Sequence, residues 1–293
     1  MSKKVYEIVN QKIKDRLEEA LKNNKKFYWV KPWNGGPTPM NFISQKSYRG
    51  INLLLLDTGE YITFKQIKEL QKKDSSIKIK KGSKQETIYY FNFMEKEDDE
   101  TGKVKNIPFL RFYKVYNIND VEGLKSNHNY EEITHTKTED MEKADKIIED
   151  FCKRDNLKIE VVKGGNKACY IPSLHAIRIP DKGQFKSIYE YYSTVLHELG
   201  HATSKTLKRE LGSSFGSEKY AFEELVAEIS SQILLAEMRI IDDNASTNSI
   251  AYLQGWLERL GKENIYYIVK ASNQATKACD FILNNAIADE KAS

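Results

Sequence analysis

Two histidines four positions apart, His197 and His201, with Glu198 directly after the first, form an HExxH pattern in this chain of 293 residues. On a helix, residues at i and i+4 project from one face, so both imidazoles can occupy two corners of a metal tetrahedron. Glu198 lies one position round the helix, where it can reach a water without binding the metal itself. The pattern therefore predicts metal-assisted hydrolysis, with His197 and His201 as ligands, Glu198 as the catalytic residue and zinc as the ion. The alternative is a pair of surface histidines on an amphipathic helix.

The residues around the motif have the spacing of a helix with one buried side. Its apolar positions are Ile188, Tyr192, Val195, Leu196 and Leu199. Gly200 stands in the middle of this pattern, although glycine costs about 1 kcal/mol relative to alanine inside a helix. We therefore expect another element to approach the helix closely at Gly200.

A catalytic zinc ion needs a third protein ligand and an open fourth position. The metzincin class would have glycine at 204 and histidine at 207, but the chain has Ser204 and Leu207, which excludes that class. A strongly apolar helix expected downstream carries Glu223, Glu224 and Glu228, and a buried carboxylate is costly unless it meets a cation. We predict Glu224 as the third ligand, with Glu223 as the alternative. Glu228 shares a face with Glu224 and suits a partner that orients a histidine. The competing interpretation is three solvated glutamates.

Two residues that precede the helix bear on the same site. Tyr170, on the strand expected before the helix, is a candidate donor to the oxyanion, with simple packing as the alternative. His175, in the loop that follows, is not expected to be a metal ligand.

The charge of the chain is divided between its halves. Residues 1–128 hold 25 lysines and arginines against 16 acidic residues, a balance of +9, whereas residues 129–293 hold 21 against 26, a balance of −5. A basic half favours a polyanionic partner, and nucleic acid is the common one. The alternative is a solvated lysine-rich surface.

Aromatic and basic residues alternate between residues 25 and 49, in a segment rich in Pro, Gly and Asn. Single-stranded nucleic acid binds by stacking its bases on aromatic faces while lysine and arginine follow the phosphates. The residues predicted to contact a single strand of DNA are Lys31, Trp33, Lys46, Tyr48 and Arg49. The alternative is that these aromatics form the core of a small domain.

The order of expected elements indicates an α+β protein of two domains. In the first half we expect a helix over residues 1–22, a strand–turn–strand unit over 76–93 with Gly82 at the turn, an acidic hairpin tip over 94–106 and a return strand over 108–124. Residues 125–138 lack periodicity, so we place the domains at 1–128 and 139–293. The second domain should run from a helix over 139–156 through strands at 158–162 and 168–180, which form a small sheet, into helices, the order of a small metallopeptidase half.

Composition narrows the setting. Three cysteines at no recognisable spacing, Cys152, Cys169 and Cys279, predict neither disulfides nor a thiolate zinc site. We find no apolar run of membrane-spanning length and no apolar segment typical of secretion in the first residues. We therefore expect a cytoplasmic protein without a membrane partner.

Several segments resemble one known family. The stretches "PWNGGPTPMNFISQKSYRGINLLLL", "IKKGSKQETIYYF" and "FYKVYNINDVEGL" resemble the N-terminal single-stranded-DNA-binding domain of the ArdC antirestriction family, which also begins TraC-type plasmid primases. The stretches "HELGHATS" and "FGSEKYAFEELVAEISSQIL" are similar to that family's C-terminal zincin-like metallopeptidase domain. The resemblance covers nearly the whole chain, in the family's order.

This resemblance implies a function. It implies a protein of conjugative plasmids or integrated elements that protects incoming single-stranded DNA from restriction. Our first hypothesis adds that the second half is a zinc metallopeptidase acting on proteins associated with DNA. The resemblance supports His197, His201 and an acidic residue of residues 223–228 as ligands, Glu198 as catalytic, and residues 33–49 as the DNA-facing region. The rival hypothesis is a single-stranded-DNA-binding protein whose metal site is structural and does not turn over.

Overall fold

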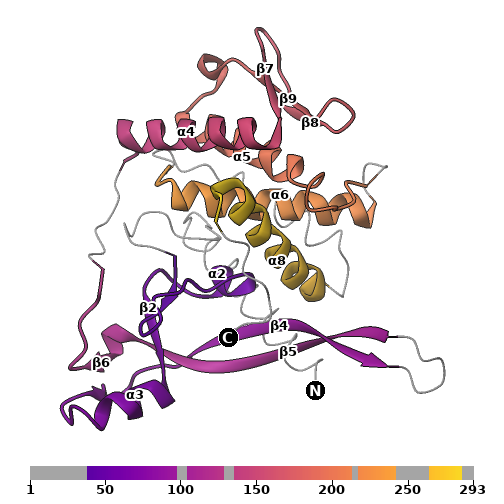
Figure 1. Ribbon diagram of the computed structural model, residues 1–293. Coiled ribbons are helices and arrows are strands. Elements are labelled where there is room, and N and C mark those ends of the chain that lie inside the picture. Colours follow the sequence, from indigo (N-terminus) through magenta and orange to yellow (C-terminus); the bar gives the residue numbers. More distant parts are fainter. Residues whose placement is uncertain (1–37, 98–103, 129–134, 213–216, 242–263, 286–293) are drawn as a thin grey trace.

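The computed structural model describes residues 38–97, 104–128, 135–212, 217–241 and 264–285. Helices and sheets are mixed in both halves of the chain, so the predicted α+β class is confirmed (Figure 1). The helix expected over residues 1–22 lies outside the described residues. Of the hairpin tip expected over 94–106, residues 98–103 also lie outside them, whereas 94–97 and 104–106 belong to two long strands. The division at residues 125–138 stays a prediction.

The first half is built on a sheet with strand order β1-β2-β5-β4. Its strands are β1 (Met40–Asn41), β2 (Glu60–Thr63), β4 (Glu86–Glu97) and β5 (Val104–Asn117), and β4 and β5 form a long antiparallel ribbon. The strand–turn–strand unit expected around Gly82 is confirmed, with strands at residues 78–79 and 86–97 and the turn between them. Strand β3 (Lys78–Ile79) pairs with β6 (Val121–Glu122), whereas β4 is the edge strand of the larger sheet and pairs with β5.

Hydrogen bonds to one buried carboxylate hold the last described residues of the first half in place. Glu60 on β2 is fully buried, and its Oε1 accepts bonds from Gln45 Nε2 at 2.8 Å and Asn127 Nδ2 at 2.7 Å. Its Oε2 accepts from Ser126 Oγ at 2.7 Å and from the Asn127 backbone amide at 2.8 Å. These hydrogen bonds favour the charged form, so they hold the pKa of Glu60 below its usual value although burial opposes this.

The described part of the second half packs four long helices under a small sheet. Its helices are α4 (Thr138–Asp155), α5 (Ile188–Ala202), α6 (Glu218–Glu237) and α8 (Asn264–Leu283). The sheet has the order β7-β9-β8, with β7 (Lys158–Val162), β8 (Cys169–Ile171) and β9 (Ala176–Pro180). The single strand expected over residues 168–180 is wrong, because the chain turns at Pro172–His175 and separates β8 from β9. His175 takes a left-handed φ of 46° in this turn.

The core of the second half extends into the first. The largest buried cluster joins residues of α5, α6 and α8 to Ile51, Leu53 and Leu55 of α2 (Ile51–Leu55) and to Tyr89 of β4. Gly50, which precedes α2, has a φ of 58°, and a Cβ there would lie 2.0 Å from Asn273 Oδ1 on α8. Its amide donates to Thr276 Oγ1 on the same helix at 3.0 Å. The two halves therefore pack directly against each other where α2 meets α8.

The expected close approach at Gly200 is confirmed. A Cβ on Gly200 would lie 3.0 Å from the Cα of Ala227 on α6. This contact sets α5 directly against α6, which brings the histidine helix next to the glutamates at 223–228. Within the described residues, the three cysteines are free, and no helix has both the length and the apolar character to cross a bilayer.

Candidate metal centre

Helix α5 presents two imidazoles from one face. His197 and His201 lie one turn apart, and their Nε2 atoms approach to 3.2 Å. Ser187 caps the helix by accepting from the Glu190 amide at 3.1 Å, and apolar residues bury the opposite side against the core. The predicted helix therefore forms with the predicted face, and both side chains are mostly shielded, at 17% and 12% exposure.

Glu224 on α6 faces both of these nitrogen atoms. Its Oε2 lies 3.5 Å from His197 Nε2, and its Oε1 lies 3.5 Å from His201 Nε2. A zinc tetrahedron with arms near 2.0–2.1 Å has edges of roughly 3.3 Å. The three donor groups therefore have the chemistry and spacing of a divalent-cation site, and they are the one such cluster among the described residues.

The neighbouring glutamates face the other nitrogen of each ring. Glu228 Oε2 lies 3.5 Å from His197 Nδ1, and Glu223 Oε1 lies 3.4 Å from His201 Nδ1. A carboxylate at Nδ1 favours a proton there and leaves the Nε2 lone pair for a metal. Glu223, Glu224 and Glu228 thus divide between the shared centre and the two outer nitrogens.

Arg209 anchors Glu223 from below α5, a contact that the motif did not predict. Its Nε and Nη2 donate to Glu223 at 3.0 and 2.8 Å, and its remaining donors reach Thr203 Oγ1 and the Gly200 carbonyl. Both side chains of the ion pair are buried, at 5% and 1% exposure. The signal in the sequence was the buried position of Glu223 itself, which demands a cationic partner nearby.

The electrostatics of the cluster match its geometry. Burial disfavours a charged His197, but the carboxylates of Glu224 and Glu228 outweigh it and raise its pKa to about 10. Burial likewise opposes the carboxylate of Glu224, while hydrogen bonds from His197 and His201 hold its pKa well below the usual value. The site therefore carries strong negative potential, which favours a bound cation.

Glu198 is buried beside the histidines and is held by the sheet. Its Oε2 accepts from the Tyr170 backbone amide at 2.7 Å, so β8 fixes the carboxylate at the edge of the cluster. The Tyr170 hydroxyl lies 2.9 Å from His175 Nδ1, and His175 Nε2 lies 3.0 Å from Asp155 Oδ2. This contact favours a packing role for the Tyr170 hydroxyl, and His175 stands apart from the candidate ligands, as expected.

The predicted DNA-contacting residues are placed differently from one another. Lys31 and Trp33 lie outside the described residues. Lys46 is exposed in the turn after β1. Tyr48 packs edge-on against Tyr61 at 6.2 Å, and burial raises its pKa.

Arg49 is used at the junction of the halves. It forms an ion pair with Asp280 on α8, next to the Gly50 contact described above. The side chains of Arg49 and Tyr48 both have partners within the fold. Their roles as DNA contacts remain predictions.

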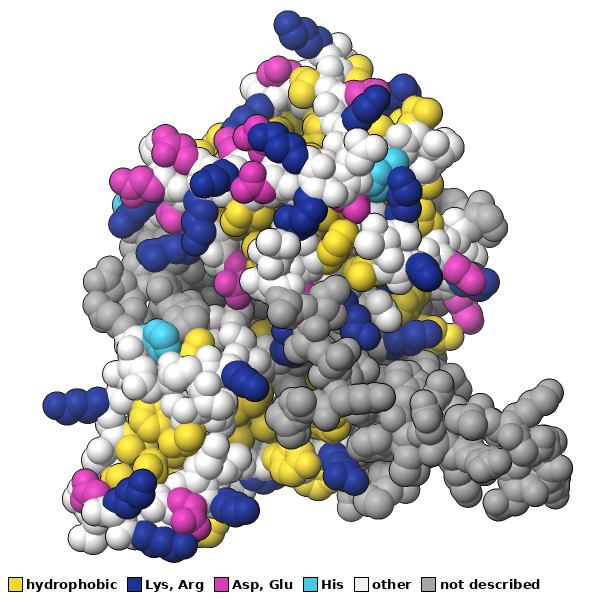
Figure 2. Space-filling view, in the orientation of Figure 1, with side chains coloured by type: hydrophobic (Ala, Val, Ile, Leu, Met, Phe, Trp, Pro, Cys, Tyr) yellow, Lys and Arg dark blue, Asp and Glu magenta, His cyan; other side chains and the backbone are white. Residues whose placement is uncertain are grey.

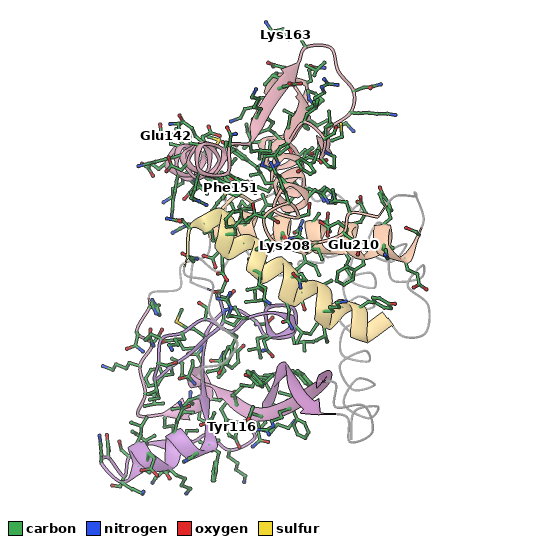
Figure 3. The ribbon with its side chains drawn as sticks, turned by 45° about the vertical axis from the view of Figure 1, so that its right-hand side comes forward. Tyr116, Glu142, Phe151, Lys163, Lys208 and Glu210 are labelled. Carbon is green, nitrogen blue, oxygen red and sulfur yellow. The ribbon has the colours of Figure 1, made fainter. Side chains whose placement is uncertain are left out.

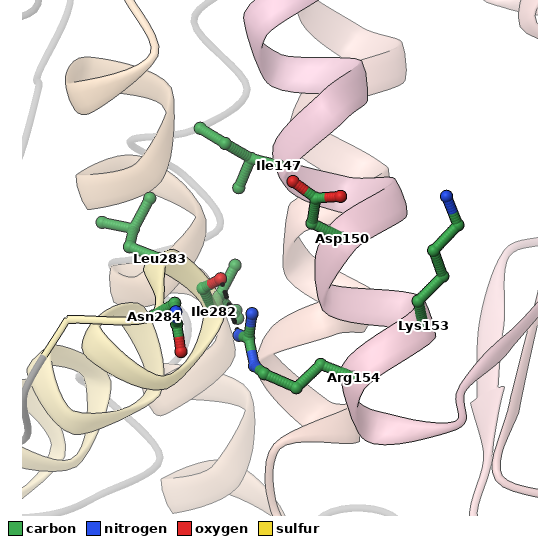
Figure 4. A pocket seen from close by; sticks show the side chains of 7 residues that line it. All are labelled: Ile147, Asp150, Lys153, Arg154, Ile282, Leu283 and Asn284. Carbon is green, nitrogen blue, oxygen red and sulfur yellow. Dashed lines mark hydrogen bonds between the residues drawn. The ribbon is translucent and has the colours of Figure 1, made fainter.

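A surface pocket of about 620 Å³ lies between α4 and α8 (Figure 4). Arg154 crosses it and donates to the Phe281 and Ile282 carbonyls at the end of α8. The pocket shares no residue with the metal cluster; it is lined by Ile147, Asp150, Lys153, Arg154, Ile282, Leu283 and Asn284.

Comparison with known proteins places both halves. Residues 3–116 match the N-terminal domain of the anti-restriction factor ArdC, and residues 144–274 match a zincin-like metallopeptidase. The crystal structure of metal-free antirestriction ArdC protein from the R388 plasmid is 30% identical, with a TM-score of 0.65, and the match covers 93% of this chain and 96% of that one. Its Mn(II)-bound structure is 29% identical with a TM-score of 0.66 over 94% and 97%.

Curated relatives match nearly the whole length of this chain. A DNA primase TraC of Escherichia coli is 33% identical over 94% of this chain, which spans 27% of that primase. The uncharacterized protein y4eC of Sinorhizobium fredii is 27% identical over 95% of this chain and 91% of its own length. The chain thus spans about a quarter of the primase, whereas ArdC and y4eC match it nearly end to end. The zincin-like match implies a metal, and the His/Glu cluster offers ligands for one. The chain belongs to the ArdC-like antirestriction family.

Proposed function

We propose that this antirestriction protein binds single-stranded DNA of a mobile element during conjugation, and that its second half is a zinc peptidase acting on proteins associated with that DNA. The observation that carries the enzymatic part is the convergence of His197, His201 and Glu224, with Glu198 buried beside them. Two imidazoles and one carboxylate favour zinc among the common divalent ions.

The proposed chemistry is hydrolysis of a peptide bond. A zinc ion, when bound, supplies Lewis acidity toward the carbonyl and lowers the pKa of a water. Glu198 takes a proton from the attacking water, whose oxygen bonds to the carbonyl carbon, and delivers the proton to the amine as the carbon–nitrogen bond breaks. The Tyr170 amide holds one Glu198 oxygen and so directs the other toward the water.

Substitution of Glu198 by glutamine separates catalysis from metal binding. Because Glu198 is not a proposed ligand, Glu198→Gln should keep one equivalent of metal by elemental analysis while lowering turnover by a factor of 100 or more. The biological assay is transfer of unmodified DNA into a restricting host against a non-restricting one. Full protection by Glu198→Gln, with metal retained, would favour the alternative in which the site is structural.

Binding of single strands is tested separately. Fluorescence anisotropy with labelled single-stranded and duplex DNA, over a salt series, should show preference for the single strand and a steep loss of affinity with salt. Equal affinity for the two forms would contradict the proposal for the first half and would leave the metal centre unaffected.

A further inference from the structure

A strongly basic lobe lies at the far end of the first half. This lysine lobe comprises α3 (Phe64–Gln71), β3, β6 and the short helix η2 (Ile118–Asp120) around a separate small core. Residues 65–84 contain eight lysines and two acidic residues. The lobe lies away from the second half, at the lower left of Figure 1, and Lys and Arg side chains border an exposed hydrophobic patch there (Figure 2).

One aromatic ring of this lobe is half exposed to solvent. Phe64, the first residue of α3, is 50% exposed, and Lys68 Nζ lies 5.3 Å from the centroid of its ring. One face of the ring thus has a cationic neighbour. Burying a Phe ring is normally favourable, so a ring held half open beside a lysine is suited to a planar partner.

The turn after β1 is attached to the start of α3, and together these two segments form what we call the rim of the lysine lobe. The side-chain amides of Asn41 and Gln66 bond reciprocally at 3.2 and 3.3 Å, which fixes residues 41–46 against the first turn of α3. This turn carries Ile43, which is 49% exposed, and the exposed Lys46. The aromatic face and the nearby cations are therefore presented by rigid elements.

The charge of the rim is not neutralised locally. Lys46, Lys65 and Lys68 are exposed and make no ion pair within the part of the chain that the structure describes. The acidic residue of α3, Glu69, is bonded to Lys72 at 2.9 Å. The rim thus combines a stacking face with free cations, the combination that binds bases and phosphates of single strands.

We propose that Phe64 is a stacking platform for a base of single-stranded DNA and that Lys46, Lys65 and Lys68 contact the adjoining phosphates. This assignment rests on the proposed binding of single strands and places a contact outside residues 33–49. A duplex does not offer an unstacked base to the ring, so the platform discriminates between single and double strands.

The aromatic contact is tested with a matched pair of variants. Phe64→Leu keeps an apolar side chain but removes the stacking face, and it should weaken binding of a labelled oligothymidylate by about 5- to 100-fold. Phe112→Leu is the control, because Phe112 is 52% exposed on β5 of the ribbon. Replacing the bases by abasic sites should cost the wild-type protein the same factor and cost Phe64→Leu little, since the stacked partner is already lost.

The phosphate contacts are tested by salt dependence. The double variant Lys65→Gln/Lys68→Gln should lower the slope of log Kd against log salt by about 0.7 for each lysine removed. Lys163→Gln/Lys167→Gln removes the same charge at the opposite end of the molecule, where Lys163 lies far from Tyr116 of the lobe core (Figure 3), and should leave the slope unchanged. Unchanged circular dichroism and metal content show that each variant is folded.

The outcomes separate the two proposals. Wild-type binding that survives Phe64→Leu, or falls equally in Phe112→Leu, would overturn the platform while leaving single-strand binding in place. Wild-type protein without preference for single strands would overturn both. Tighter binding to anionic lipid vesicles than to DNA would assign the lysine lobe to a membrane surface instead.

Discussion

At the scale of single residues, the metal centre is defined by which ring nitrogen each carboxylate faces. Glu224 faces both Nε2 atoms, whereas Glu223 and Glu228 each face one Nδ1. Three glutamates within six positions of one helix therefore have different tasks, although their chemistry is the same. Burial and direction, rather than residue type, assign those tasks.

A ranking of metal affinities tests this division. Glu224→Ala removes a donor atom and should abolish tight binding, while Glu228→Ala removes an orienting partner and should weaken it by about 10- to 100-fold. Glu218→Ala, an exposed change at the start of α6, is the control and should have no effect. The measurement is competition with a chromogenic zinc chelator. Equal losses for Glu224→Ala and Glu228→Ala would contradict Glu224 as the third ligand.

Arg209 should affect the metal without touching it. Arg209→Met leaves Glu223 buried without a cation, so His201 loses its fixed orientation and affinity should fall by about 10-fold or more. Arg209→Lys should recover part of the loss, because lysine keeps the charge but cannot form both bonds. Lys205→Met, an exposed neighbour, is the control. Affinity that is unchanged in Arg209→Met would make the ion pair purely structural.

At the scale of elements, hydrogen bonds to one buried carboxylate hold the turn after β1 to the end of the first half. Because the folded protein lowers the pKa of Glu60, its contribution to stability is present above the unfolded value near 4.5 and is lost as pH falls through the folded value. Protonation of Glu60 at low pH should therefore weaken the attachment of the segment that carries Lys46.

Glu60→Gln should lower the free energy of unfolding by about 2 kcal/mol at pH 7, because a neutral amide cannot accept all four bonds. The difference from the wild-type protein should shrink as pH falls below about 4.5. Urea titrations at several pH values measure both effects. Glu69→Gln, whose carboxylate is 58% exposed, should change stability by less than about 0.5 kcal/mol.

Local patterns predicted the elements better than their pairing. The spacing of apolar residues located α5 and α6, because that spacing is a property of one helix. The cost of Gly200 predicted a close approach there, but only the structure identifies the neighbour as Ala227. Pairing of β3 with β6 depends on a partner more than 40 positions away, which no local pattern contains. Likewise, Arg209 and Phe64 lie outside any motif, and their surroundings appear only when distant segments meet.

At the scale of the whole molecule, one apolar core joins the two halves. The protein should therefore unfold in one cooperative transition, and a metal at the His/Glu cluster should raise the midpoint for the first half as well as the second. Hydrogen exchange at Asn52 and Tyr89, read with and without zinc, checks this coupling. Two separate transitions, with protection confined to α5 and α6, would contradict it.

The junction at α2 also decides how the protein can be dissected. A fragment ending near residue 128 would keep Ile51, Leu53 and Tyr89 but lose the α8 surface that shields them. Such a fragment would expose this apolar surface to solvent, and it would self-associate or bind unrelated proteins. The affinity for DNA measured with an isolated first half would then partly reflect aggregation. DNA-binding assays should therefore use the intact chain.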